Sequence, residues 1–539
     1  MTEQLPPSAK SLDLTLFKKT GLMSFTHKVF VGSKRLKHPD KKNSQWHLKN
    51  IPNNLSKKQA IPLAELEVFA QEYRRLLCPT HLFNGKNIYT KYRLAYDEQH
   101  PDNLYVASKS LKLMGRSGDF SFDHEGTLTF KDDPTTGLNL KDIPGLGCSC
   151  LFAKILGEVD FKIQNAVIIN DGLKADGTPQ LYFSQIDSEW SFAGTANTKF
   201  RSLNLDTGLM TAGEVIANPY TLSKFYNYLS LIQKGTDHYQ FKEFLLKTSQ
   251  EPHVKQETMI TALRSALLPD FFEEPLMSHY FSKSKSSQKT KKTIQSYMKE
   301  QKNILVEVLT QESECREFFL NDDAIQSGLL RKELNEMFNS LKEFTAYGKV
   351  KPSDEITDFE EKFILNLQEF ITLMIMNPTM NKDQRKAFFN EAKQASAQSD
   401  FNRLFFKTVC LSIESSIYEQ IKSLSLNFEH RREMIQSSGS WSDYNDLKTE
   451  IKSSIAMIDD ILDKLESLPP SGLEEYNREV RRLRDDLIEK NKLLQVSATT
   501  YQKMYRYLVP KSEKKLLFSG HGELFAEGIY HAHNIQPRK

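Results

Sequence analysis

"GEVDFKIQNAVII", residues 157–169, places three polar side chains in a short turn directly before a run of aliphatic residues. The turn has the pattern D-x-K-x-x-N, formed by Asp160, Lys162 and Asn165. A loop beside a rigid strand holds such groups still, as a catalytic group requires. A charged surface turn would have the same composition, so the neighbouring segments must decide between the two interpretations.

The segments around this turn read as regular elements. A short helix is expected over about 146–156, and strands are expected over "NAVIIN" (165–170) and "LYFSQIDS" (181–188). The Gly- and Asp-rich stretch "DGLKADGTPQ" (171–180) separates the strands and predicts a turn. The second strand leads into Asp187, which brings another acid to the end of the hairpin.

The first hundred residues alternate strands with one helix. Strands are expected over 12–19, 25–31, 45–51, 87–96 and 104–113, with a hairpin near 119–131. The helix is expected over 61–79, where apolar residues recur at three- and four-residue spacing and Pro79 ends the pattern. Lys49 therefore lies on the third strand, and Glu67 on the helix that follows it.

This order of elements resembles the protein kinase-like fold, and in detail its atypical branch with phosphatidylinositol 4-kinases and HipA-type kinases. "ELEVFAQEYRRLLCPTHLF" (65–83) is similar to the helix of that branch, and "QIDSEWSFA" (185–193) to its metal-binding segment. The similarity extends to the kinase-like effectors that Legionella injects through its Dot/Icm system, on Ser108-Lys109, the 157–165 turn and 186–190. The resemblance covers roughly residues 12–240.

The resemblance implies a role for each candidate residue. Asp160 and Lys162 would be catalytic, with Asp160 on the acceptor hydroxyl and Lys162 on the transferred phosphate. Lys49 would hold the α/β-phosphates of ATP and Glu67 would orient it. Asn165 and Asp187 would supply oxygen ligands to Mg²⁺, or to Mn²⁺. These roles agree with the demands of phosphoryl transfer, which are positioning and charge neutralisation.

Several residues compete for these roles. Lys109 in "VASK" is a rival to Lys49, but residues 110–141 offer only Glu125 as its partner. Glu65 and Glu72 compete with Glu67 and could equally face solvent. No G-x-G-x-x-G motif lies between the first two strands, where "KKTGLMS" (18–24) stands instead. Glu189 stands where this branch often has glycine, which leaves room for a catalytically dead pseudokinase.

The expected function is therefore an ATP- and Mg²⁺-dependent atypical kinase that phosphorylates protein hydroxyls inside a host cell. The lysine of D-x-K-x-x-N favours a protein acceptor, because it is typical of Ser/Thr protein kinases. A lipid kinase and an AMP-transferase on the same fold are alternatives. A pseudokinase scaffold tethered to a membrane is the alternative from another class.

Composition sets limits on the class of protein. The chain has 539 residues, 39% of them hydrophobic, and a formal net charge of +3, which is too small to require a nucleic-acid partner. Its five cysteines are scattered, which favours a reducing compartment over a disulfide framework. No apolar run has the length of a signal peptide or a membrane span. For an injected effector, we expect the host cytosol, with host membranes as a further location.

After about residue 210 the pattern is almost entirely helical. We expect a kinase-like domain over 12–280, with a small lobe over about 12–113 and a large lobe over about 140–280. "SKSKSSQKTKK" (282–292) has five lysines and no apolar residue, which predicts a basic linker or loop over 281–300. A helical extension over 301–425 and a C-terminal helical hairpin region over 426–539 would follow. Two leucine-rich stripes, interrupted by "PPSG" (469–472), predict that antiparallel hairpin. The expected fold class is thus α+β, a two-lobed kinase-like fold followed by an all-α region.

Positive charge is concentrated in two parts of the chain. Residues 1–60 hold twelve Lys or Arg and three acidic residues. Such an excess predicts a polyanion site, with an inositol polyphosphate as the candidate activator, at Lys18, Lys19, Lys34, Arg35, Lys37, Lys41 and Lys42. The clusters at 283–292, 478–484 and 510–518 predict contact of the helical half, chiefly its C-terminal region, with an anionic phosphoinositide-bearing membrane.

Overall fold

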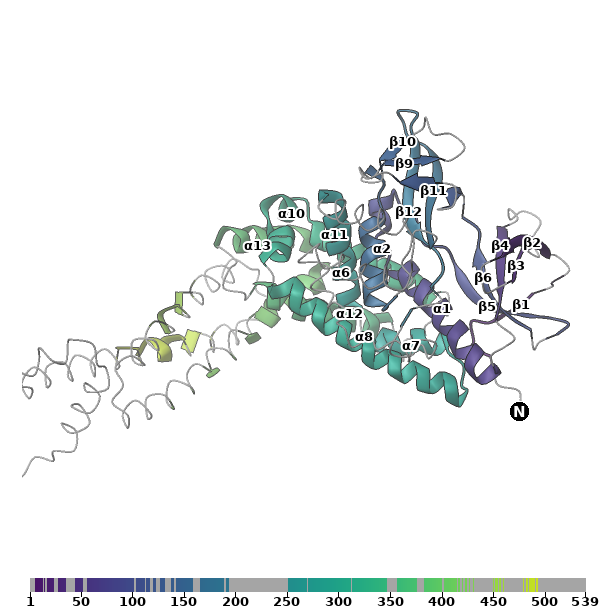
Figure 1. Ribbon diagram of the computed structural model, residues 1–539. Helices are drawn as coiled ribbons and strands as arrows, with labels where there is room; N and C mark the ends of the chain where they lie inside the picture. The colour runs from purple at the N-terminus through teal and green to yellow at the C-terminus, as the bar shows by residue number, and fades with distance from the viewer. Residues whose placement is uncertain are drawn as a thin grey trace, which may run out of the picture. The chain divides into compact units, whose positions relative to one another are not determined.

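The computed structural model divides the chain into two units, Met1–Asn366 and Leu367–Lys539. It describes residues 5–12, 14, 17–23, 28–34, 44–51, 56–100, 103–111, 113–116, 120–122, 127–130, 137–139, 142–158, 165–188, 191–192, 251–268, 270–311, 313–346, 356–375, 382–399 and 402–413, with scattered helical residues between 415 and 492 (Figure 1). The class is α+β, as the sequence predicts.

A six-stranded sheet forms the N-terminal part of the first unit, in the order β1-β5-β6-β4-β3-β2. Its strands are β1 (Lys10–Leu12), β2 (Phe17–Met23), β3 (Lys28–Lys34), β4 (Ser44–Asn50), β5 (Tyr92–Asp97) and β6 (Leu104–Lys109). All neighbours pair antiparallel except β1 and β5, which run parallel. Trp46 and Leu48 of β4 pack with Tyr105 and Ala107 of β6 in one core. Because side chains alternate along a strand, Lys49 points to the opposite face.

That opposite face is covered by helix α1 (Lys57–Leu77), which contacts β5 and β6 (Figure 1). Ser56 precedes the helix, and its backbone N–H donates to Oε1 of Gln59, 3.4 Å away, as in a capping box. Lys49 is in register with Val106 and, through it, with Leu94. The lysine therefore belongs to the row of side chains that faces α1.

Two three-stranded sheets follow. One has the order β10-β9-β8, built from β8 (Phe120–Phe122), β9 (Thr127–Phe130) and β10 (Gly137–Asn139). The other has the order β12-β11-β7, built from β7 (Leu113–Arg116), β11 (Ala166–Leu173) and β12 (Pro179–Gln185). β11 and β12 are the two strands predicted on either side of 171–180, and they pair antiparallel as a hairpin, with Ala166 opposite Gln185. Their shared end carries the residues just before β11 and just after β12.

Helices make up the rest of the first unit. They are α2 (Leu146–Ile155), α6 (Pro252–Leu267), α7 (Asp270–Tyr280), α8 (Lys285–Gln311), α9 (Ser313–Leu320), α10 (Asp322–Gln326) and α11 (Leu329–Ala346). α2 packs on α6 and on β12, and α6 in turn packs on α8. All ten residues of α2 are buried. Through its contact with β12, α2 attaches the β11–β12 hairpin to these helices.

The loop expected over 281–300 is absent: from Lys285 onward this segment is the first part of helix α8. Ser287 is fully buried, and Ser282 donates its backbone N–H to Glu65 of α1 at 2.8 Å. Lys291 is buried and forms an ion pair with Glu274 of α7. The prediction of a loop was wrong because serine and paired lysine can pack against neighbouring helices without any apolar side chain.

The second unit contains the end of α12 (Ile356–Ile375), α13 (Lys382–Ser396) and a helical segment over 402–413. Within the predicted hairpin, Asp459 and Arg484 form an ion pair. The PPSG turn lies midway between these residues along the chain, so their pairing agrees with an antiparallel hairpin. The turn itself and residues 493–539, including the basic cluster 510–518, lie outside the described residues.

Among the described helices, none combines the length and the apolar character that a bilayer span needs. Of the predicted polyanion residues, Lys18, Lys19 and Lys34 are on β2 and β3, with side chains outside the described part. Arg35, Lys37, Lys41 and Lys42 lie outside the described residues altogether.

Candidate functional site

Lys49 lies between two carboxylates that come from distant parts of the chain. Its Nζ is 3.3 Å from both oxygens of Glu67 on α1 and 3.0 Å from Oδ1 of Asp187, just after β12. The side chain of Lys49 is 17% exposed, that of Glu67 5% and that of Asp187 34%. The site is therefore anchored on the buried side and open to solvent at Asp187.

The competing glutamates on α1 have other partners. Glu65 accepts the N–H of Ser282, and Glu72 accepts the N–H of Tyr92 at 2.8 Å as well as the hydroxyl of Tyr280. Both are buried, so the expectation that they could face solvent was wrong. Of these three glutamates of α1, Glu67 is the one that lies against Lys49.

The rival lysine, Lys109, is exposed at the end of β6. Its backbone pairs with Trp46 of β4, so the two lysines lie on adjacent strands but at different positions along them. Glu125, its only candidate partner, lies outside the described residues. The geometry therefore favours Lys49.

The backbone at Asp187 is unusual, because its φ is +64°. Aspartate is one of the few residues that tolerate this left-handed region, and such residues concentrate at functional sites. The N–H of Asp187 points to the hydroxyl of Tyr92 at 3.5 Å. Burial first, and then the negative charges of Glu67 and Asp187, raise the pKa of Tyr92, so this hydroxyl stays neutral and can donate.

Asn165 stands at the same end of the β11–β12 hairpin as Asp187. Its carbonyl oxygen accepts the N–H of Ile186 at 2.8 Å, which ties the residue before β11 to the residue before Asp187. Asn165 is buried. Asp160 and Lys162, the two predicted catalytic residues, lie outside the described residues, as does Glu189.

Helix α1 is linked to the segment after Asp187 by contacts that the sequence did not reveal. Gln71 donates from Nε2 to the hydroxyl of Ser188 at 2.8 Å. Phe69 stacks on Phe192 at 6.1 Å between ring centroids, and Phe192 also has a positive φ of +58°. The helix that holds Glu67 and the segment that holds Asp187 are thus fixed to each other.

A buried charge lies behind this contact. Arg74 of α1 is fully buried, 4.0 Å from Glu158, which accepts the hydroxyl of Ser191 at 2.8 Å. Burial lowers the pKa of Arg74, and the charge of Glu158 opposes that effect. Glu158 directly precedes the segment with Asp160, so the pair connects α1 to the predicted catalytic turn. Arg74 lies in the quoted segment 65–83 and Glu158 in 157–169. Their pairing joins segments distant in the sequence, so no local pattern predicts it.

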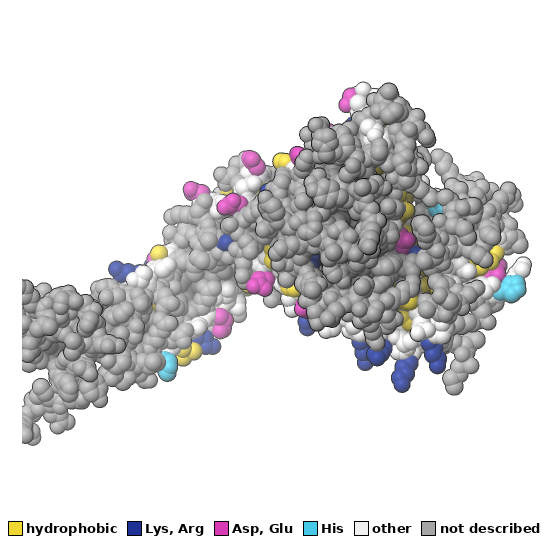
Figure 2. Space-filling view, viewed as in Figure 1, with side chains coloured by type: hydrophobic (Ala, Val, Ile, Leu, Met, Phe, Trp, Pro, Cys, Tyr) yellow, Lys and Arg dark blue, Asp and Glu magenta, His cyan; other side chains and the backbone are white. Residues whose placement is uncertain are grey.

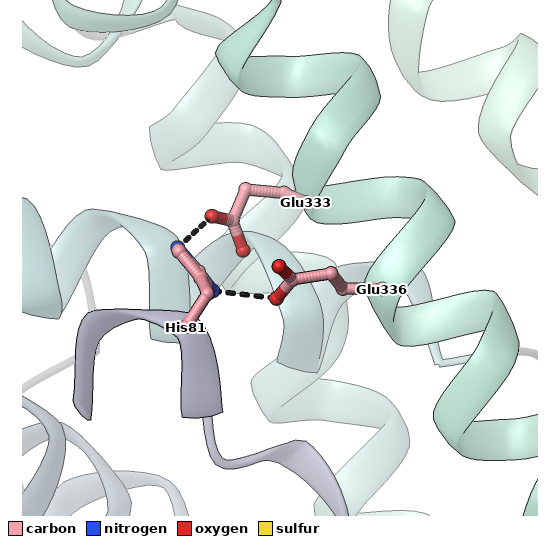
Figure 3. A group of neighbouring side chains, drawn as sticks. All are labelled: His81, Glu333 and Glu336. Atoms are coloured by element: carbon pink, nitrogen blue, oxygen red, sulfur yellow. Dashed lines mark ion pairs between the residues drawn. The ribbon is translucent and has the colours of Figure 1, made fainter. Parts of the chain in front are cut away.

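A second cluster of titratable groups lies at His81, Glu333 and Glu336, whose ligand atoms are all within 4.8 Å of one another (Figure 3). His81 comes from the short 3-10 helix Thr80–Phe83, and the two glutamates stand one turn apart on α11. Arg264 of α6 donates to both glutamates at 3.0 Å. A guanidinium in that position repels a cation, so we assign the cluster a structural role as an ion-pair network.

The first cluster is the one whose chemistry suits catalysis or ligand binding. It combines a cation held by a buried glutamate with a carboxylate that is a third exposed. The lysine suits an anionic group such as a phosphate, and the carboxylate and amide oxygens of Asp187 and Asn165 suit a hard cation. The sequence matches no protein-family model, and comparison with curated proteins finds no relative of this chain.

Proposed function

We propose that this chain is an ATP- and Mg²⁺-dependent atypical kinase with a two-lobed kinase-like fold. The observation that carries the proposal is the contact of Lys49 with Glu67 and Asp187. A small-lobe strand lysine paired with a glutamate of the helix that follows is a requirement of protein kinases, as is an aspartate that holds the metal. Three residues chosen for these roles from their order in the sequence meet at one point.

The order of elements supports the same proposal. The strand with Lys49 is followed by the helix with Glu67, by β5 and β6, by α2 and by the β11–β12 hairpin. Asn165 and Asp187 flank that hairpin at one end. This is the order from which the resemblance was inferred, now with the contacts of a common site.

The residues fit the groups that such a reaction needs. Lys49 would bind the α/β-phosphates, and Asn165 and Asp187 would hold Mg²⁺, which neutralises phosphate charge when bound. The hydroxyl oxygen of the acceptor would form the new bond to the γ-phosphorus as the bond to the β-phosphate oxygen breaks. Asp160 would receive the hydroxyl proton, and Lys162 would stabilise the transferred group.

The acceptor is proposed to be a protein hydroxyl of a host cell, on the strength of Lys162 in D-x-K-x-x-N. Lipid phosphorylation and AMP transfer remain the competing reactions, and a pseudokinase scaffold is the competing function. ATP labelled at the γ-phosphate reports phosphoryl transfer, whereas label at the α-phosphate reports AMP transfer. The two labels therefore separate these reactions when protein and lipid mixtures are offered.

The decisive experiment compares the wild-type chain with Asp187→Asn, because asparagine tolerates the positive φ and removes the charge. We expect Mg²⁺-dependent incorporation from γ-labelled ATP by the wild type and a loss of at least a hundredfold in the variant, typical of lost transition-state stabilisation. Lys109→Gln is the matched control and should keep full activity. Equal labelling by wild type and Asp187→Asn would exclude the proposed site.

A further inference from the structure

The first half of α8 carries a row of lysines on its outer face. Lys285, Lys289, Lys292 and Lys299 follow one another at spacings of four, three and seven residues, which places them on one side of a helix. All four are exposed. The row is about 21 Å long at 1.5 Å per residue. Dark blue side chains project from the lower edge of Figure 2, in the region where Figure 1 draws α8.

These four lysines differ from the other lysines of the helix. Lys291 forms an ion pair with Glu274, and Lys302 donates to the carbonyl of Leu268. Within the described part of the chain, the side-chain ammonium groups of these four lysines have no hydrogen bond or ion pair. Their charge is not used to hold the fold together.

The row is unfavourable for the helix itself. Lys285 lies in the first turn, where the helix dipole is positive, and that turn has no acidic residue. Lys285 and Lys289 are four residues apart, so they also repel each other. Helix α13, by contrast, has Asp383 in its first turn. A cost of this kind is retained where the charge serves binding.

We propose that this lysine row docks the protein on an anionic membrane surface. On this face Ser296 lies between Lys292 and Lys299, and Asn303 follows Lys299, so the face offers no apolar anchor for a protein interface core. It has no arginine to grip a phosphate in a fixed geometry and no aromatic ring on which a nucleobase could stack. Flexible point charges suit a mobile layer of lipid headgroups.

The test is sedimentation of the full chain with two kinds of vesicle, phosphatidylcholine alone and an equimolar mixture of phosphatidylcholine and phosphatidylserine. We expect the wild type to pellet with the anionic vesicles only, and less so as salt rises. Each lysine near such a surface is worth about fivefold in partitioning. The variant Lys285→Gln/Lys289→Gln/Lys292→Gln/Lys299→Gln should therefore lose partitioning by at least a hundredfold if three or more of the lysines reach the headgroups.

The control variant removes the same charge from scattered exposed positions, as Lys10→Gln/Lys58→Gln/Lys174→Gln/Lys332→Gln. It should pellet at least a tenfold better than the α8 variant. The melting temperature of the α8 variant should equal or exceed that of the wild type, which shows that the fold is retained. Equal pelleting of the two variants would overturn the proposal, and so would wild-type binding to duplex DNA without binding to the anionic vesicles.

Discussion

At the scale of single residues, Lys49 is held by two carboxylates that approach it from two sides. The buried carboxylate of Glu67 fixes the ammonium group from one side, while Asp187, a third exposed, approaches it from the solvent side. A lysine that faced solvent alone would sample many rotamers and would hold a phosphate poorly. The pair with Glu67 therefore orders the lysine before any ligand binds.

Replacing Lys49 with glutamine should destabilise the protein even without a ligand. The change leaves Glu67, which is 4% exposed, near Asp187 with no cation between them. We expect a loss of about 2 kcal/mol in the free energy of unfolding, the size of a hydrogen bond to a charged group. Urea unfolding measures it, with Lys109→Gln expected within about 0.5 kcal/mol of the wild type. The double variant Lys49→Gln/Glu67→Gln should be more stable than Lys49→Gln, and the reverse order would contradict the pairing.

The sequence revealed the residues of this site better than their surroundings. Lys49, Glu67 and Asp187 were found because each stands in an element whose place in the order is recognisable. The supporting pair of Arg74 and Glu158 was not found, because neither residue has a local pattern that predicts burial. Because charged residues are rarely fully buried, a sequence pattern alone predicts a surface position for them.

At the scale of elements, α1 is buried on nearly all sides. Its polar residues Glu65, Glu67, Gln71 and Arg74 all have less than 5% exposure. Each must find a partner, because an unpaired buried polar group is costly. The partner of Glu65 is Ser282, just before α8, and that of Glu67 is Lys49 of β4. Gln71 contacts Ser188, and Arg74 contacts Glu158. The three- and four-residue spacing of apolar residues predicted the helix. It did not predict that the polar residues of the helix would also be buried and would contact other segments.

The start of helix α2 depends on a buried acid and should respond to pH. Glu257 of α6 accepts the N–H groups of Gly145 and Gly147 at 2.8 and 2.9 Å. Burial raises the pKa of Glu257 to about 7, although these N–H donors oppose the shift. In the unfolded chain the pKa is 4.5. The folded state thus binds the extra proton, and this contribution to stability is complete below pH 4.5 and is lost as the pH rises through 7.

Glu257→Gln should remove that dependence. We expect the wild type, relative to the variant, to lose on the order of 3 kcal/mol of unfolding free energy between pH 4.5 and 7, given 1.36 kcal/mol per pKa unit. Denaturant unfolding at several pH values gives the difference, and other carboxylates cancel because both proteins share them. A difference that stays constant across this range would show that Glu257 is charged in the folded state throughout.

The ion-pair network at Arg264 joins three elements of the first unit. Arg264 of α6 donates to the carbonyl of Cys78, after α1, and to Glu333 and Glu336 of α11. Removing one partner of a buried pair leaves an uncompensated charge, so Arg264→Met should cost roughly 3–5 kcal/mol. Thermal or urea unfolding measures the loss, with the exposed Lys332→Met as control. Arg264→Met/Glu333→Met should recover part of it; a double variant as unstable as the sum of its singles would deny the coupling.

Helix α8 shows where composition misleads. Its first nine residues, 285–293, have no apolar side chain before Ile294, so a loop was predicted. The helix is held because its buried Ser287 accepts the hydroxyl of Ser282, whose backbone N–H donates to Glu65 of α1, and because Lys291 has a partner on α7. Such stabilisation comes from residues distant in the sequence and leaves no periodic apolar pattern.

At the scale of the whole molecule, a net charge of +3 conceals a strong asymmetry. The first 60 residues have an excess of nine positive charges, and α8 carries a separate row of lysines. The remaining chain is accordingly acidic on balance. Two basic parts of the sequence allow two separate anionic ligands, a soluble polyanion for the N-terminal region and a membrane for α8. The two ideas can be tested against each other with the same variants.

A soluble polyanion should stabilise the protein through the N-terminal lysines. So many like charges in one region repel each other, and a bound polyphosphate relieves that repulsion by charge-assisted contacts. We expect inositol hexakisphosphate to raise the melting temperature, because a ligand that binds only the folded state at a hundred times its Kd adds about 2.7 kcal/mol. Lys34→Gln/Arg35→Gln/Lys37→Gln/Lys41→Gln/Lys42→Gln should abolish most of the shift, whereas the four-lysine variant of α8 should keep it. If both variants lose the shift equally, the polyanion binds by total charge and the N-terminal region is no dedicated site.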